Sequence, residues 1–119
     1  MRKQMEITIS VSKKGRAVVI LNGKFNIEHV QIFEEKMSQL FSAKAKLIVI
    51  DLKKVRLIDS SGIGSLIKTL NTAKNSESEL ILINITEEIA NIFSISYLDK
   101  FFTIKTDKEL MRLYPDLNL

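Results

Sequence analysis

The chain has 119 residues, of which 45% are hydrophobic and 27% are charged, and it contains no cysteine, which excludes disulfides, thiolate metal sites and a cysteine nucleophile. Its length is typical of one domain and too short for two ordinary ones, so we expect a single domain over residues 1–119. The net charge of +4 comes from 18 basic and 14 acidic residues scattered along the chain, without the dense basic cluster and interleaved aromatics of a nucleic-acid surface.

The chain opens with "MRKQMEITIS", which passes directly into alternating sequence without an apolar block of signal-peptide length. The longest apolar runs, such as "LILI", are far shorter than a membrane span. We therefore expect a cytoplasmic protein that does not enter a membrane.

The first three expected elements are a hairpin and a helix. Residues 5–11 alternate with period two, which places Met5, Ile7, Ile9 and Val11 on one face of a strand. "KKGR" at 13–16 is a turn, and 17–23 is a second strand, so the two strands should be antiparallel. A helix capped by Asn26 follows, with apolar residues at helical spacing: Ile27, Val30, Phe33, Met37, Leu40 and Phe41.

The middle of the chain reads as two buried strands around a helix. Residues 46–52, "KLIVIDL", are nearly all apolar, as in a strand covered on both faces with parallel neighbours. Residues 79–85, "ELILINI", read the same way. Between them a helix begins around Ser60 to Gly62, and its apolar positions are Ile63, Leu66, Ile67, Leu70 and Ala73.

The last third should contain two more helices and an edge strand. Thr86 can cap a helix with Glu87 and Glu88 in its first turn, where carboxylates suit the positive end of the dipole. Residues 101–105 read as a short edge strand, and 107–114 as a final helix stopped by Pro115. The order predicts an α/β fold: a mixed sheet of about four to five strands, with an initial antiparallel hairpin, packed against about four helices.

The hexapeptide "DSSGIG", residues 59–64, stands where a strand should end and a helix begin. Ser60 or Ser61 could simply cap the helix, a contribution of about 1 kcal/mol, while Gly62 and Gly64 permit tight packing. Alternatively, a serine here could be phosphorylated, since backbone N–H groups and the helix dipole would hold the phosphate. The residue types alone leave both interpretations open.

Serine catalysis finds little support in the sequence. A hydrolase elbow requires Gly-x-Ser-x-Gly and a general base, but "IDSSG" lacks the first glycine and the single histidine, His29, lies on the first helix. Ser65 to Lys68 matches Ser-x-x-Lys without the companion motifs of that enzyme class, and we interpret it as chance. A small α/β serine hydrolase remains a remote alternative.

Metal and nucleotide sites are equally poorly supported. Asp51 and Asp59 are eight residues apart, and each has a structural explanation, Asp51 as a polar residue at a strand end and Asp59 ahead of the helix cap. His29 has no second ligand at chelating spacing, and a glycine-rich phosphate loop is missing. We expect no catalytic residue, metal, cofactor or small-molecule substrate.

Three segments together resemble one family. "VVILNGKFN" is similar to its second strand and following turn, "DSSGIG" to its phosphorylation loop, and "IANIFSISYLDKFFTIKTDKEL" to its third helix and closing segment. In this order they resemble the STAS domain, found in bacterial anti-sigma factor antagonists and in the cytoplasmic tails of sulfate transporters. The resemblance covers nearly the whole chain and favours the antagonist branch.

The resemblance implies a partner switch. The unmodified protein would bind an anti-sigma factor that is also a serine protein kinase, releasing a sigma factor; phosphorylation of Ser60 would abolish binding, and a PP2C-type phosphatase would reverse it. The implied partner-binding loop comprises Asn26, Asp59, Ser61, Gly62, Ile63 and Gly64. The alternative is a STAS interaction module of a larger sensory or transport assembly that is not phosphorylated.

Two residues depart from the family pattern. Where the family commonly has an acidic residue and then Asp after the glycine of the second strand, this chain has Lys24 and Asn26. The loop beside Ser60 should therefore be less acidic than usual, which bears on how a phosphate is tolerated and how the kinase recognises the site.

Overall fold

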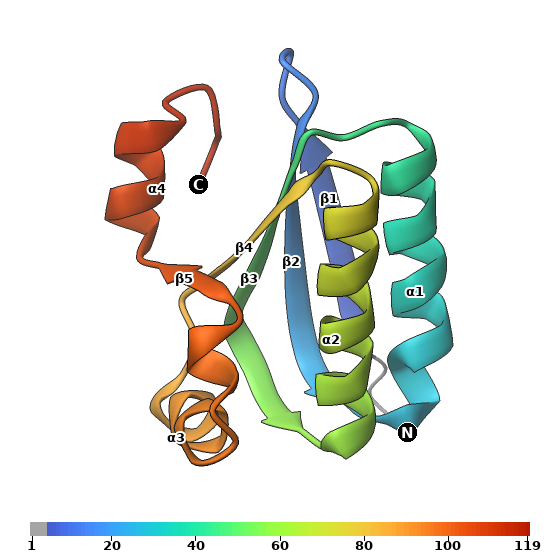
Figure 1. Ribbon diagram of the computed structural model, residues 1–119, viewed down its shortest axis with the longest axis vertical. Coiled ribbons are helices and arrows are strands. Elements are labelled where there is room, and N and C mark those ends of the chain that lie inside the picture. The colour runs from blue at the N-terminus through green and yellow to red at the C-terminus, as the bar shows by residue number, and fades with distance from the viewer. Residues whose placement is uncertain (1–4) are drawn as a thin grey trace.

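The computed structural model describes residues 5–119, in which five strands form one sheet with helices on both faces (Figure 1). Opening residues 1–4 lie outside the described part. The elements are β1 (Glu6–Val11), β2 (Arg16–Phe25), α1 (Ile27–Ser42), β3 (Leu47–Ile58), α2 (Ser60–Asn75), β4 (Glu79–Ile83), α3 (Glu87–Ile95), a 3-10 turn η1 (Leu98–Lys100), β5 (Thr103–Lys105) and α4 (Asp107–Leu113). The strand order is β1-β2-β3-β4-β5, with β1 antiparallel to β2 and the remaining neighbours parallel. The predicted mixed sheet with its initial hairpin is confirmed.

The β1–β2 hairpin is closed by a three-residue turn. Ser12 N–H donates to the Arg16 carbonyl at 2.8 Å, and Gly15 N–H donates to the Ser12 carbonyl at 2.9 Å. Gly15 has φ +75°, a left-handed conformation that glycine adopts without strain. Strand β2 begins one residue earlier than predicted, at Arg16, and continues two residues further, to Phe25.

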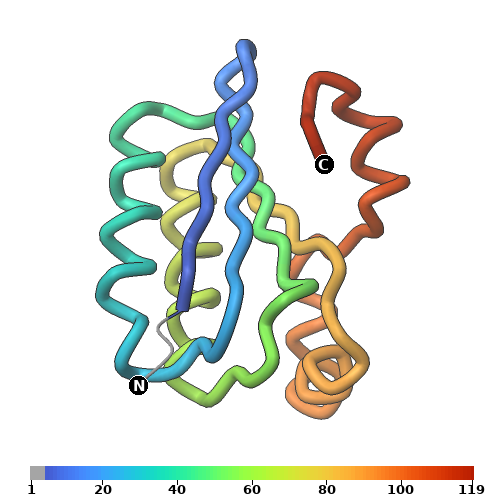
Figure 2. The backbone as a smooth tube through the Cα atoms, turned by 180° about the vertical axis from the view of Figure 1, so that it is seen from behind, coloured from blue at the N-terminus to red at the C-terminus, as the bar shows by residue number. Residues whose placement is uncertain are grey.

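The central strands are covered on both faces, as their apolar sequences predict. On one face α1 and α2 cover the larger core cluster, in which the Phe25 and Phe33 rings lie 4.8 Å apart (Figure 1). On the other face α4 and the C-terminal segment cover a smaller cluster (Figure 2), whose members are Val18, Leu47, Val49, Ile81, Ile83, Leu110 and Leu117. Two-sided burial explains why β3 and β4 show no simple alternation of apolar and polar residues.

The C-terminal segment is fastened to the sheet by polar contacts as well. Thr106 caps α4 in a capping box with Glu109. After α4, the Tyr114 hydroxyl donates to Glu79 at 2.7 Å, and the Arg16 guanidinium lies 4.6 Å from the centre of the Tyr114 ring. These contacts hold the C-terminus against the start of β2 and β4, at the end of the sheet where α2 finishes rather than begins.

Four local predictions differ from the structure. β3 was predicted to end at residue 52 but runs to Ile58, because Val55 and Ile58 turn inward and extend its apolar face. β4 ends at Ile83 rather than residue 85, since Asn84 has φ +57°. η1 was missed, and β5 is limited to its last three predicted residues.

The helices were predicted closely, with two exceptions on their apolar faces. α1 and α3 begin after the predicted caps Asn26 and Thr86, whose side chains accept backbone N–H bonds. Ile27 and Ile67, expected on the core faces of their helices, are 68% and 36% exposed. Within residues 5–119, no helix has the length and apolar character needed to cross a membrane.

Candidate functional site

The candidate site lies where β2 and β3 end side by side. Phe25 and Ile58, the last residues of these parallel strands, are paired, and Asp59 N–H donates to the Phe25 carbonyl at 3.3 Å. The next residues, Asn26 and Asp59, begin α1 and α2, so two helix N-termini meet at the lower edge of the sheet in Figure 1. This is the carboxyl edge of a parallel sheet, where α/β proteins commonly place functional groups.

Asp59 caps α2. Its Oδ1 accepts hydrogen bonds from Ser61 N–H at 3.0 Å and Gly62 N–H at 3.1 Å, and its carbonyl accepts from Ile63 N–H at 3.0 Å. The interpretation in which Ser60 or Ser61 caps this helix is therefore wrong. An extended backbone at Asp59, with φ −104°, allows its short carboxylate to reach the second and third helical residues, which Ser60 cannot do from inside the helix.

Ser60 is left without a structural task. It is the first residue of α2, it is exposed, and its hydroxyl makes no hydrogen bond to any residue from 5 to 119. The sequence suggested that backbone N–H groups of the first turn would hold a phosphate here. Two of those donors, on Ser61 and Gly62, are already taken by Asp59, so a phosphate on Ser60 would add its charge beside a carboxylate instead of replacing it.

The two glycines of the loop have different surroundings. A Cβ on Gly62 would lie 2.5 Å from the Phe25 carbonyl oxygen and 2.8 Å from Ile58 Cγ1, distances that real Cβ atoms do not show. Gly62 therefore permits the close approach of α2 to the ends of β2 and β3. A Cβ on Gly64 would have no neighbour within 4 Å, so nothing inside the described chain requires glycine there.

The β2–α1 loop is fixed by His29. Its buried ring bonds the Lys24 carbonyl through Nδ1 at 2.8 Å and accepts Met5 N–H at Nε2 at 3.3 Å. Because Nε2 accepts, Nδ1 carries the proton and donates. His29 thus links α1 to β2 and to Met5. Both of its ring nitrogens are engaged in these hydrogen bonds, so it is not placed to act as a base for Ser60.

Lys24 and Asn26, the two departures from the family pattern, are differently placed. Asn26 is half-buried and caps α1, its Oδ1 accepting Glu28 N–H at 3.1 Å. Lys24 is exposed and is paired across the strands with Leu57. Asn26 therefore keeps the cap of α1 but carries no charge. Lys24 adds a positive charge one residue before the end of β2.

Exposed apolar side chains also belong to the edge of the sheet where β2 and β3 end; the sequence singled out Ile63 there, but not Ile27 or Leu57. Ile27 is 68% exposed and is the first residue of α1, the position that Ser60 has in α2. Leu57 is 51% exposed near the end of β3, and Ile63 is half-buried in the first turn of α2. The signal for Ile27 was available, because it lies about 120° from Phe33 on a helical wheel and so leaves the core stripe.

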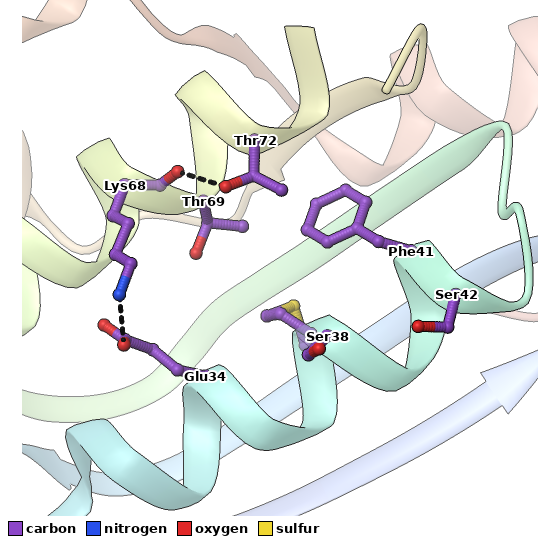
Figure 3. Close-up of a pocket in the computed structure, with 8 residues that line it drawn as sticks. Glu34, Ser38, Phe41, Ser42, Lys68, Thr69 and Thr72 are labelled. Carbon is purple, nitrogen blue, oxygen red and sulfur yellow. Dashed lines mark hydrogen bonds and ion pairs between the residues drawn. The ribbon is translucent and has the colours of Figure 1, made fainter. Parts of the chain in front are cut away.

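The Ser-x-x-Lys pair is structural. Ser65 Oγ donates to Glu34 Oε2 at 2.9 Å. Lys68 Nζ donates to Glu34 Oε1 at 2.9 Å (Figure 3). The Lys68 hydrogen bond has the largest effect and lowers the pKa of the Glu34 carboxyl; burial, the second largest effect, opposes it, and the Ser65 hydrogen bond adds to the lowering. Both side chains are committed to one carboxylate, which joins α2 to α1.

The same ion pair borders a groove between α1 and α2. The groove has a volume of about 440 Å³ and is lined by Met37, Phe41, Thr69 and Thr72, among others (Figure 3). These residues belong to the second halves of the two helices, whereas Ser60 is at the start of α2. The groove is therefore separate from the candidate site.

Asp51 and Asp59 do not converge. Asp51 lies within β3 and not at its end, because the strand continues to Ile58; its Oδ1 accepts from Lys53 N–H at 2.9 Å and Asn84 Nδ2 at 3.3 Å. Asp59 is committed to the α2 cap. Among residues 5–119, no three His, Cys, Asp or Glu side chains are grouped to hold a metal ion.

A family model and several known proteins match this chain. The model of the STAS domain matches residues 7–111. An anti-sigma-B factor antagonist of Staphylococcus aureus (strain NCTC 8325 / PS 47) is 23% identical over 92 residues, which cover 77% of this chain and 85% of that protein.

Two solved structures have the same fold. An anti-sigma factor antagonist from Mycobacterium paratuberculosis has a TM-score of 0.81 at 18% identity, covering 95% of this chain and 96% of that one. The Bacillus cell fate determinant SpoIIAA in its phosphorylated form has a TM-score of 0.71 at 19% identity, covering 90% of this chain and 97% of that one.

Proposed function

The chain belongs to the STAS domain family, and on that premise we propose that it is an anti-sigma factor antagonist switched by phosphorylation of Ser60. In its unmodified form it binds, in the cytoplasm, an anti-sigma factor that is also a serine kinase, and thereby releases a sigma factor. The kinase transfers the γ-phosphoryl group of ATP to Ser60 Oγ and ADP leaves. A PP2C-type phosphatase hydrolyses the ester with water, and inorganic phosphate departs.

The observation that carries this proposal is that Asp59 and Ser60, neighbours in the chain, differ in role: Asp59 caps α2, and Ser60 is not needed for the cap. Asp59 alone caps α2, and the exposed hydroxyl of Ser60 has no partner among the described residues. A kinase can therefore reach Ser60, and esterifying it breaks no contact of the fold. The chain then serves as a substrate and a switch, with no catalytic residue of its own.

The surroundings of Ser60 suit a docking surface. Ile63 lies in the same helical turn as Ser60, and Ile27 and Leu57 offer exposed apolar area at the edge where β2 and β3 end. The bare backbone at Gly64 lets a partner approach the exposed side of α2 closely. Apolar side chains that are exposed together at one edge of a domain are typical of interaction sites. The partner would bury Ser60 as a neutral hydroxyl.

Charge then explains release. A phosphoserine adds about 1.5 to 2 negative charges, directly beside the carboxylate of Asp59. The first-turn N–H groups of Ser61 and Gly62 are occupied, so the new charge stays at the surface and must be desolvated by any bound partner. A penalty of about 3 kcal/mol would lower the affinity about a hundredfold.

The test is phosphorylation of the full chain by its partner kinase with ATP, followed by fragment mass spectrometry. We expect one phosphate, on Ser60, none on the Ser60→Ala variant, and unchanged incorporation by the matched control Ser61→Ala. Incorporation that Ser60→Ala does not affect would contradict the proposal. Tight binding without any incorporation would favour a STAS module of a larger sensory or transport assembly.

A further inference from the structure

β1 forms one edge of the sheet. The bond from Ser12 N–H to the Arg16 carbonyl fixes the alternation of the hairpin ladder: Ser12 and every second residue before it exchange hydrogen bonds with β2. The backbone N–H and C=O groups of Ile7, Ile9 and Val11 therefore point away from β2. Among residues 5–119, no other strand lies on that side, since β1 is the first strand of the sheet.

This edge lacks the features that usually prevent strand pairing. β1 reads "EITISV", with no lysine, proline or bulge and one charged residue, Glu6, at its first position; all six of its residues are in register with β2. Ile7 and Ile9 are only half-buried on the helix side of the sheet, and Val11 is 57% exposed. The opposite edge, β5, is only three residues long. β1, with six residues, therefore offers a longer edge for pairing with another strand.

We propose that two copies of this chain pair through β1, antiparallel, about a two-fold axis at Ile9. Ile9 then lies opposite Ile9 of the second copy, and Ile7 lies opposite Val11 of the second copy. On the other face, Thr8 lies opposite Ser10 of the second copy. The two five-stranded sheets become one sheet of ten strands.

The sequence is self-complementary in this register, and two other registers are less favourable. Outward-pointing backbone groups belong to the odd-numbered residues, so pairing must match odd with odd, and a slip of one residue would place isoleucines opposite polar side chains. An axis at Thr8 would require the N–H of Met5, which already donates to His29 Nε2 at 3.3 Å. The axis at Ile9 uses the outward groups of Ile7, Ile9 and Val11 and no committed donor.

Charge favours the same arrangement. Glu6 of one copy comes opposite Ser12 of the other, beside the exposed turn residues Lys13 and Lys14, and opposite charges on neighbouring strands attract. The two-fold axis repeats this contact at both ends of the pairing. Ile32, 40% exposed, lies on the flank of α1 opposite Glu34, which faces α2, and so extends the apolar area above β1.

The pairing is independent of the phosphorylation proposal. β2 separates β1 from β3, the strand that leads into Asp59 and Ser60. A dimer formed along β1 leaves both copies of the Ser60 surface outside the contact. Failure of one proposal would therefore say nothing about the other.

Sedimentation equilibrium of the full chain measures the pairing directly. We expect a monomer–dimer equilibrium in which Val11→Lys, at an exposed position, raises the dissociation constant at least tenfold with an unchanged circular dichroism spectrum. The control is Ile95→Lys, at a position 81% exposed at the end of α3, which should leave the equilibrium unchanged. A wild-type chain that stays monomeric at about 1 mM, or a dimer disrupted by Ile95→Lys and not by Val11→Lys, overturns the proposal.

The register has its own test, because the chain contains no cysteine. Thr8→Cys and Ser10→Cys are made as separate single variants at exposed positions. In the proposed register these residues are directly opposite and at a separation that a disulfide can span. An equal mixture should oxidise to a crosslinked dimer at least tenfold faster than either variant alone. Equal rates in all three samples would rule out this register.

Discussion

The inner and outer sides of the first turn of α2 are built for different purposes. On the inner side, Gly62 fits against the ends of β2 and β3 with no room for a Cβ, and Asp59 holds two backbone N–H groups. On the outer side, the Ser60 hydroxyl has no hydrogen-bond partner among residues 5–119, and a Cβ on Gly64 would have no neighbour within 4 Å. One six-residue motif thus contains residues that the fold requires and residues that, in our proposal, a partner contacts.

Because the two sides differ, the effect of a substitution on stability can be separated from its effect on partner binding. Changes on the inner side should lower the free energy of unfolding, and any loss of binding would follow from that. Changes on the outer side should alter partner binding with the fold intact. The substitutions Gly62→Ala, Asp59→Ala and Gly64→Ala test whether each residue affects stability or binding as its position on the inner or outer side predicts.

Gly62→Ala should have the largest effect on stability. The new Cβ would meet backbone at Phe25 and a buried side chain at Ile58, neither of which can move without shifting a strand. We expect a loss of about 2–3 kcal/mol in the free energy of unfolding, measured by urea denaturation. A loss below about 0.5 kcal/mol, the scale of ordinary surface changes, would place Gly62 on the outer side.

Asp59→Ala should come next. It removes the acceptor of the Ser61 and Gly62 N–H groups, and loss of such a cap costs about 1–2 kcal/mol. Ser60→Ala, one residue further, is the matched control and should change the free energy of unfolding by less than about 0.5 kcal/mol. If parallel urea titrations showed equal destabilisation by the two variants, Ser60 would contribute to stability as much as Asp59 does, which would contradict the assignment.

Gly64→Ala should act in opposite directions on stability and binding. Alanine removes the entropic cost of glycine within a helix and meets no neighbour, so stability should rise by up to about 1 kcal/mol. Partner affinity should fall, because the added methyl group prevents close approach to the exposed side of α2. Denaturation and calorimetric binding on the same sample check both signs, and unchanged binding would remove Gly64 from the partner surface.

Glu34→Gln should have the smallest effect, and one that depends on pH. The pKa of Glu34 is lowered from its ordinary value of 4.5, chiefly by the Lys68 hydrogen bond. Its stabilisation is therefore fully present above pH 4.5 and is lost as the pH falls through the lowered pKa. Because the Lys68 side chain is 70% exposed, the effect should be about 0.2–1 kcal/mol.

Thermal unfolding between pH 3 and pH 7 measures this effect. The wild-type chain should lose more stability than Glu34→Gln does over the acid part of the range. Glu35→Gln, at the next residue on the exposed side of α1, should retain the wild-type pH dependence. Identical acid profiles for Glu34→Gln and the wild-type chain would mean that the carboxylate adds nothing to the contact between α1 and α2.

Much of the fold was predictable because apolar spacing determines which face of each element is buried. The hairpin, the buried strands and the caps Asn26 and Thr86 followed from spacing and residue type. The extension of β3 did not, because Lys53, Lys54 and Arg56 resemble a loop when read alone. Only the pairing with β2, irregular at two points, keeps Val55 and Ile58 turned inward.

The position of "DSSGIG" at a strand-to-helix junction was predictable from the sequence, but the residue that caps the helix was not. Three consecutive residues, Asp59, Ser60 and Ser61, can each cap a helix, and residue type does not choose between them. The choice depends on where the extended backbone ends, which is set by the hydrogen bond from Asp59 N–H to Phe25 in a different strand. The exposure of Ile27 and Leu57 likewise depends on tertiary packing.

The affinity of the kinase partner for the two forms of the protein tests the switch most directly. Isothermal titration calorimetry on the unmodified chain and on the chain carrying one phosphate at Ser60 should give dissociation constants that differ about a hundredfold, with the same unfolding temperature for both. Equal dissociation constants would contradict the account, since the added charge would then stand outside the surface that the partner covers.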